Sequence, residues 1–147
     1  MLIIWLYYNL LHLDLDGKIL LNTLVNPNKK IYWSAEKVHG ISNSMVQNAP
    51  DVREIARKVH DILKNRIMIA YNARFDARII KQSFNLNVKH ECLMHNVMGF
   101  IGTHKYVSLE VATSNIRNDY QEHRALGDCY LCLKLIKSSP GLEEEVS

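Results

Sequence analysis

Two short motifs in this chain hold acidic residues where metal-dependent chemistry is feasible. In His123-Arg-Ala-Leu-Gly-Asp128 a histidine precedes an aspartate closely enough to put a proton acceptor and a metal-binding carboxylate at one helix start. In Tyr71-Asn-Ala-Arg-Phe-Asp76 the aspartate follows an apolar run, Ile67–Tyr71, that is typical of a buried strand. Ligands of open α/β sheets bind beyond the carboxyl ends of strands. The two carboxylates therefore predict a divalent-metal site at one sheet edge.

The elements that position these motifs alternate between strands and helices, which indicates an α/β fold. Asp16-Gly17 lies between alternating apolar residues, so residues 10–25 are predicted to form an antiparallel hairpin. Capping signals and helical periodicity predict helices over residues 51–65, 74–84 and 124–137, with a parallel strand over 67–71. We expect one domain over residues 1–139, followed by an acidic tail over residues 140–147.

Several motifs in order resemble those of the DnaQ-like, or DEDDh, 3′ to 5′ exonucleases. His39-Gly-Ile-Ser42, followed by Met45 and Ala49-Pro50, is similar to the family's "HGI, then M, then AP" segment. Asn72–Asp76 is similar to its N-A-x-F-D motif, and His123–Asp128 to its H-x-A-x-x-D motif. The resemblance implies a ribonuclease H-like fold, a mixed sheet flanked by helices.

The resemblance also implies roles for individual residues. Asp76 and Asp128 would be metal ligands and His123 the general base, while His39, Asn72 and Phe75 would contact substrate. The implied cofactor is Mg²⁺ or Mn²⁺, two ions in the intact family, and the implied reaction is two-metal hydrolysis of phosphodiesters at 3′ ends of single-stranded DNA or RNA. The resemblance also implies a DNA polymerase as a partner. The sequence leaves open whether the chain forms a homodimer.

The chain departs from the family at its start. Members carry a D-x-E motif on the first, central strand, and the sequence has no such motif ahead of the hairpin. We therefore expect an amino-terminally truncated domain that lacks or replaces the first central strand, with residues 2–8 filling that space or extending the second strand. Two ions would bring a charge of +4 against −2 from two aspartates, so we expect little hydrolysis.

Asp14-Leu-Asp16 offers two interpretations. As two carboxylates on one strand face, the pair could substitute for the D-x-E motif. As part of a hairpin turn with Gly17, it would have a structural role, and the Asp-Gly signal favours this second interpretation.

The composition is consistent with a nucleic-acid-binding domain, but by itself it does not indicate one. The formal charge is +3, and without the three glutamates Glu143–Glu145 it becomes +6. Basic residues that could contact a polyanion are Lys29, Lys30, Arg74, Arg78, Lys81 and Lys105. The apolar amino terminus is too short to span a bilayer and has no signal-peptide features, and three cysteines fit a reducing compartment; we expect a cytoplasmic protein with no membrane partner.

Two other function classes stay open. Cys129-Tyr-Leu-Cys132 could join Cys92 and His123 around zinc in a structural or nucleic-acid-binding module. The domain could also be a pseudo-exonuclease that binds nucleic acid or a polymerase without cutting. The absent D-x-E motif is the observation that favours this second alternative.

Overall fold

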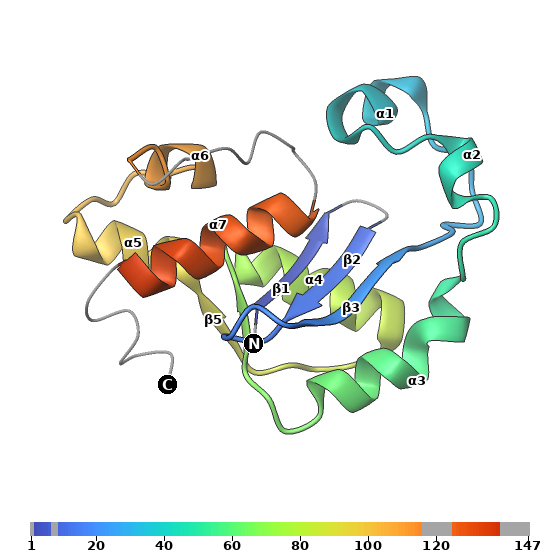
Figure 1. Ribbon diagram of the computed structural model, residues 1–147, viewed down its shortest axis with the longest axis horizontal. Helices are drawn as coiled ribbons and strands as arrows, with labels where there is room; N and C mark the ends of the chain where they lie inside the picture. Colours follow the sequence, from blue (N-terminus) through green and yellow to red (C-terminus); the bar gives the residue numbers. More distant parts are fainter. Residues whose placement is uncertain (1, 7–8, 116–124, 139–147) are drawn as a thin grey trace.

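A five-stranded mixed sheet forms the centre of the molecule in the computed structural model, which describes residues 2–6, 9–115 and 125–138 (Figure 1). The strands lie in the order β3-β2-β1-β4-β5. Their bounds are β1 Leu2–Leu6, β2 Asn9–Leu13, β3 Ile19–Leu24, β4 Met68–Ala70 and β5 His90–Cys92. β2 is antiparallel to both β1 and β3, whereas β4 is parallel to both β1 and β5. The predicted hairpin and the predicted parallel strand are both confirmed.

The central position is held by β1. Leu2 pairs with Leu13 of β2 on one side and with Ile69 of β4 on the other. Residues 2–6 therefore occupy the central place, as one of the two sequence interpretations proposed, and the alternative of a sheet without a central strand is wrong. An uninterrupted apolar segment suits this place because a central strand is covered on both faces.

The turn between β2 and β3 is closed by one carboxylate. Asp14 Oδ1 accepts hydrogen bonds from the backbone N–H groups of Asp16, at 3.1 Å, and Lys18, at 2.8 Å. Gly17 has φ +87°, and a Cβ atom there would lie 3.3 Å from Leu133 Cδ2. Glycine therefore meets two demands at once: a left-handed backbone and close approach to the last helix.

Helices cover both faces of the sheet. The helix α7, Ala125–Ser138, packs on β1 and β2, and Figure 1 shows it in front of the strands with α4, Ala73–Phe84, behind them. Next to α4 lies α3, Val52–Leu63, which begins with a complete capping box between Asp51 and Glu54. Two shorter helices, α5 Leu93–Phe100 and α6 Leu109–Ala112, lie between β5 and α7 in the chain.

The segment between β3 and α3 forms a separate projection. It contains α1, Trp33–His39, and α2, Asn43–Val46, and Figure 1 shows both helices standing away from the sheet. Its small core is built from Ile31, Ile41 and Val46 and is distinct from the main core. The sequence analysis did not predict these helices, because they are short and their apolar residues are few.

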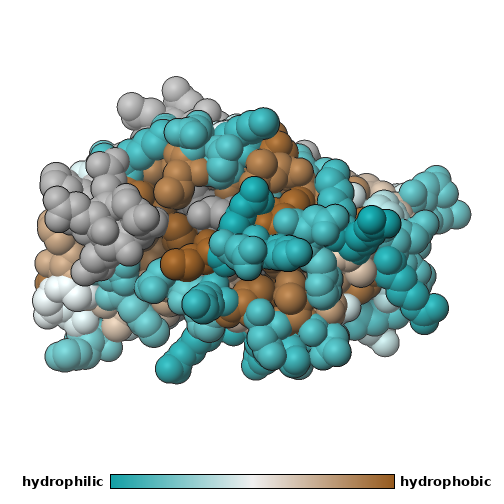
Figure 2. Space-filling view, turned by 90° about the horizontal axis from the view of Figure 1, so that it is seen from below, coloured by the Kyte–Doolittle hydropathy of each residue, from teal (hydrophilic) through white to brown (hydrophobic). Residues whose placement is uncertain are grey.

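The surface is chemically mixed. Figure 2 shows hydrophobic patches on the underside of the molecule, separated by hydrophilic side chains. Within the described ranges, no helix has the length and apolar character needed to cross a membrane. The acidic tail predicted over residues 140–147 lies outside the described residues.

Candidate active site

The first carboxylate of the candidate site, Asp76, lies in the first turn of α4. The chain leaves β4 at Ala70, and α4 begins three residues later at Ala73. The backbone carbonyl of Asn72 accepts hydrogen bonds from the N–H groups of Phe75, at 2.9 Å, and Asp76, at 3.4 Å. Asp76 is only 6% exposed. A nearly buried carboxylate beyond the carboxyl end of a parallel strand is a feature that packing alone does not favour.

Tyr71 holds this strand end in place from several sides. Its carbonyl accepts hydrogen bonds from Met94 N, at 3.0 Å, and from Cys92 Sγ, at 3.4 Å. Its hydroxyl donates to the carbonyl of Val107 at 2.8 Å. Burial raises the pKa of the phenol, and Cys132 and Tyr106 raise it further. Tyr71 therefore stays neutral and fixes the backbone from which the turn to Asp76 departs.

The second carboxylate, Asp128, is half-buried in the first turn of α7. Its charge and that of Asp76 both influence the fully buried thiol of Cys132, one turn further along α7. Burial raises the pKa of Cys132, and the negative charges of Asp128 and then Asp76 raise it further. The charges of two carboxylates from distant parts of the chain thus both raise the pKa of one buried thiol.

The other predicted site residues divide into three groups. Asn72 and Phe75 are exposed beside Asp76, with the Arg78 guanidinium 5.5 Å from the centre of the Phe75 ring. His39 is buried at the end of α1, where its Nδ1 accepts the backbone N–H of Ile41 at 3.0 Å. Burial lowers the His39 pKa, an effect opposed by the charge of Glu36. His123 lies outside the described residues.

The pair Asp14 and Asp16 lies in the turn between β2 and β3. Asp14 follows Leu13, the last residue of β2, which pairs with Leu2 of β1. The Asp14 carboxylate closes this turn, because its Oδ1 accepts the backbone N–H groups of Asp16 and Lys18. The hairpin interpretation is confirmed, and it accounts for the Asp14 side chain without a metal ion.

The described cysteines do not form a zinc site. Cys92, Cys129 and Cys132 are buried and unbridged. Across residues 2–6, 9–115 and 125–138, no three histidine, cysteine, aspartate or glutamate side chains converge as metal ligands would. The proposed fourth ligand, His123, lies outside these ranges. The cysteines instead contribute small apolar side chains to the core.

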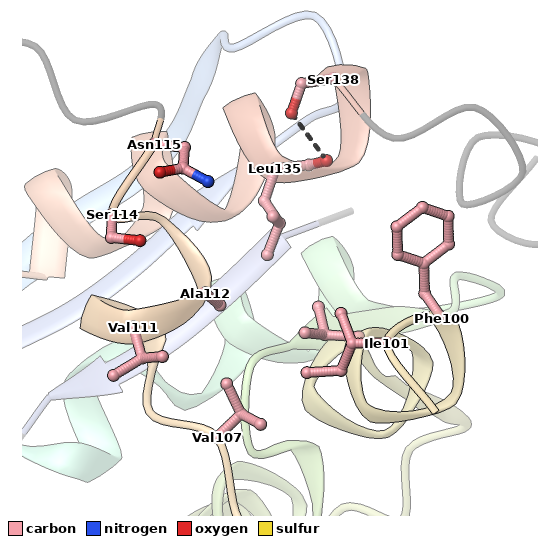
Figure 3. A pocket seen from close by; sticks show the side chains of 10 residues that line it. Phe100, Ile101, Val107, Val111, Ala112, Ser114, Asn115, Leu135 and Ser138 are labelled. Atoms are coloured by element: carbon pink, nitrogen blue, oxygen red, sulfur yellow. Dashed lines mark hydrogen bonds between the residues drawn. The ribbon is translucent and has the colours of Figure 1, made fainter. Parts of the chain in front are cut away.

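A separate cavity of about 300 Å³ lies between α5, α6 and α7. Its lining is mainly apolar, and Figure 3 shows Leu135 and Val107 pointing toward each other across the space. The described residues of the lining include no carboxylate, which distinguishes them chemically from the site at Asp76 and Asp128.

Comparison with known proteins agrees with this geometry. The profile of the exonuclease family named after RNase T matches residues 12–136, which include both carboxylates. The chain belongs to this exonuclease family. The family uses divalent metal ions, and its DnaQ-like members have the ribonuclease H-like fold that this chain shows.

Relatives with similar sequences include phage and bacterial proteins. The uncharacterized exonuclease CP81 of Escherichia phage 186 is 31% identical over 145 residues, an alignment that covers 84% of this chain and 74% of the phage protein. A DNA polymerase III subunit epsilon-like protein of Rhodobacter capsulatus is 31% identical over 117 residues, covering 73% of this chain but only 16% of the longer protein.

Solved structures show the same fold. Exonuclease X, in complex with 5′ overhanging duplex DNA, superposes with a TM-score of 0.65 at 24% identity, covering 94% of this chain and 86% of that one. A full-length 3′-exonuclease gives a TM-score of 0.68 at 16% identity, covering 94% of this chain and 53% of that one.

Sequence reasoning missed the supporting role of Tyr71. In the sequence Tyr71 is only the last residue of an apolar run. This pattern does not signal a supporting role, because the partner of its hydroxyl group, the carbonyl of Val107, is distant in the sequence.

Proposed function

We propose that this chain is a DEDDh-type 3′ to 5′ exonuclease domain that binds the 3′ end of single-stranded DNA or RNA beyond the carboxyl end of β4, where α4 begins. The observation that carries the proposal is the burial of Asp76, which is only 6% exposed in the first turn of α4. Packing alone gives no reason to bury a carboxylate there, whereas a bound cation does.

The donor set fits a hard divalent cation. Asp76 and Asp128 provide carboxylate oxygens, and Mg²⁺ or Mn²⁺ prefers oxygen ligands while keeping several waters. When bound, such ions would activate the attacking water and stabilise the leaving 3′ oxygen. In this proposal His123 takes the proton of the water, and Asn72 and Phe75, exposed next to Asp76, contact the terminal nucleotide. His39 orders the end of α1 beside the substrate.

Hydrolysis by this chain alone is expected to be slow. The strand at the centre of the sheet, Leu2–Leu6, carries no acidic residue. With two carboxylates instead of the family's four, cation affinity falls, and the transition-state charge is stabilised less. This favours, as a second function, binding of nucleic acid or of a polymerase without cutting.

Titration calorimetry with MnCl₂ tests the metal site directly. We expect weak binding by the unmodified chain and no detectable binding by Asp76→Asn or Asp128→Asn. Asp61→Asn is the matched control, because Asp61 is an exposed acid of α3 and should leave binding unchanged. Equal binding by all four proteins would contradict the assignment of the ligands.

Hydrolysis separates the first function from the second. A 5′-labelled single strand is incubated with Mn²⁺, and shortening from its 3′ end is followed. Slow shortening that Asp128→Asn abolishes supports the exonuclease, whereas no shortening together with retained strand binding supports the binding function.

A further inference from the structure

The projection formed by α1 and α2 presents exposed aromatic and basic side chains together. Tyr32 is 73% exposed and Trp33 is 69% exposed, although large aromatic side chains are normally buried. Lys29, Lys30 and Lys37 are exposed in the same segment. We call these five residues the α1 patch.

The two kinds of side chain are in direct contact. Lys37 Nζ lies 3.8 Å from the centre of the Trp33 ring, one helical turn away on α1. The ammonium group thus lies over an exposed indole. A ring and a cation held together match the two parts of a nucleotide, its base and its phosphate.

The backbone beneath the patch is held firmly. The Asn43 side chain accepts a hydrogen bond from Ile31 N at 2.7 Å and donates one to Ile31 O at 2.9 Å. Ile31 belongs to the small core of the projection and is 1% exposed. Tyr32 and Trp33 follow directly, so the residues that carry the exposed rings start from a fixed point, which lowers the entropy cost of binding.

Charge favours a polyanion as the ligand. From Pro27 to Gln47 the sequence has three lysines and a single acid, Glu36. An apolar protein partner would gain from the rings but would have to desolvate the three ammonium groups. Phosphates neutralise these groups while bases stack on the rings.

We propose that the α1 patch is a second binding site for single-stranded nucleic acid, on which bases stack against Tyr32 or Trp33 and phosphates pair with Lys29, Lys30 and Lys37. This inference rests on the proposed function for the class of ligand, single-stranded nucleic acid. It does not depend on hydrolysis at the proposed metal site. Stacking requires unpaired bases, so single strands bind more tightly than duplexes. The site needs no metal.

Fluorescence anisotropy in EDTA tests this binding. The probe is an oligothymidylate of about 12 nucleotides, labelled at its 5′ end. We expect Trp33→Ala to weaken binding roughly 5- to 150-fold, as loss of one stacked base would, and Trp33→Phe to keep most of the affinity. The triple variant Lys29→Ala, Lys30→Ala, Lys37→Ala should lower the slope of log affinity against log salt by about 2.

The matched controls remove a ring of similar exposure, or the same number of positive charges, outside the α1 patch. Phe100→Ala removes a ring that is 72% exposed, and a triple alanine variant of the exposed Lys58, Lys64 and Lys89 removes the same charge. Both should bind nearly as well as the unmodified chain. Circular dichroism confirms that each variant is folded.

Three outcomes would overturn the inference. One is an unchanged affinity in Trp33→Ala, and another is an equal loss in Phe100→Ala. The third is a change in sedimentation of the free protein in Trp33→Ala without a change in strand affinity, which would identify the patch as a protein contact. Failure of the metal site is distinguishable, because Asp76→Asn should bind the probe normally in EDTA.

Discussion

At the scale of single residues, the most costly side chain in the sheet is His12. It is fully buried in β2, and neither ring nitrogen has a hydrogen-bond partner among the described residues. Burial lowers its pKa from 6.5 to about 3. A neutral imidazole in this place loses its hydrogen bonds to water and gains none in return, which lowers the stability of the folded state.

We predict that His12→Leu stabilises the protein and that its advantage grows in acid. Below pH 6.5 the unfolded chain binds a proton at His12 that the folded chain refuses until about pH 3. Stability of the unmodified protein therefore falls as pH drops through this window, by about 1.4 kcal/mol for each unit of pH. The leucine variant lacks this loss.

Urea unfolding near pH 7.5 and near pH 5 measures the effect. The stability gap between the two proteins should widen by about 2 kcal/mol at the lower pH. His104→Leu, at an exposed position, should show no such widening. A gap that stays constant with pH would show that His12 has a partner or is accessible to water.

His39 differs from the two aspartates because its ring makes a structural hydrogen bond within its own segment. Asp76 and Asp128 act on Cys132 from two helices, whereas His39 uses its Nδ1 within its own segment to bind Ile41 N. Substitution of His39 therefore alters the end of α1 as well as any substrate contact.

At the scale of elements, the β2-β3 turn shows how a local signal can imitate a functional one. Asp14 and Asp16 have the spacing of a metal-binding pair, but the Asp14 carboxylate is occupied by two backbone N–H groups of the turn. Turn formation uses the same residue type as metal binding, so spacing alone does not separate the two roles.

We predict that Asp14→Ala destabilises the protein by about 1 kcal/mol, since two turn hydrogen bonds are lost at an accessible site. Asp16→Ala should change stability much less, because Asp16 contributes its backbone N–H to the turn and its side chain is exposed. Neither variant should alter Mn²⁺ binding. Chemical denaturation and calorimetry measure both effects, and loss of Mn²⁺ binding in either variant would restore the substitute interpretation.

The α1–α2 projection carries the exposed rings of the α1 patch. The projection has a small core of its own, and the Asn43 side chain makes two hydrogen bonds to the backbone of Ile31. The projection can therefore form without burying Tyr32 or Trp33. Exposed rings therefore persist at no cost to the main core, which leaves them available for stacking.

At the scale of the whole molecule, the identity of the central strand determines the chemistry. A central strand ends at the same sheet edge as β4, so a carboxylate near its carboxyl end would lie beside Asp76 and Asp128. The segment Leu2–Leu6 holds this place with apolar and aromatic residues only.

We predict that fusing a strand with a D-x-E motif to the amino end of the chain raises Mn²⁺-dependent shortening of a single strand by at least 100-fold, roughly the effect of regaining one or two groups that stabilise transition-state charge. The added strand would have to displace residues 2–6 from the central position. Release of mononucleotides from the 3′ end measures the gain.

The matched control carries N-x-Q in place of D-x-E, which keeps the strand but removes its charge. It should fold equally well and remain slow. A gain of the same size in the control would show that strand pairing, and not ligand number, limits the activity.

The sequence by itself determined the features that depend on neighbouring residues. The Asp-Gly turn signal predicted the β2-β3 hairpin, the apolar run before Asn72 predicted β4, and the capping box predicted the start of α3. Motifs in family order also indicated an exonuclease, which the match over residues 12–136 confirmed. Turn, capping and periodicity signals act over a few residues, so they can be recognised without the fold.

Only the tertiary structure decided which segments meet. An apolar segment such as Leu2–Leu6 has no periodicity that selects its place, and its position at the centre depends on hydrogen bonds to β2 and β4. The effect of the Asp76 and Asp128 charges on the pKa of Cys132 likewise depends on how α4 and α7 are arranged around the sheet. Exposure of Trp33 depends on a projection with a core of its own. Such contacts join residues far apart in the chain, and their free energy is decided by the fold as a whole.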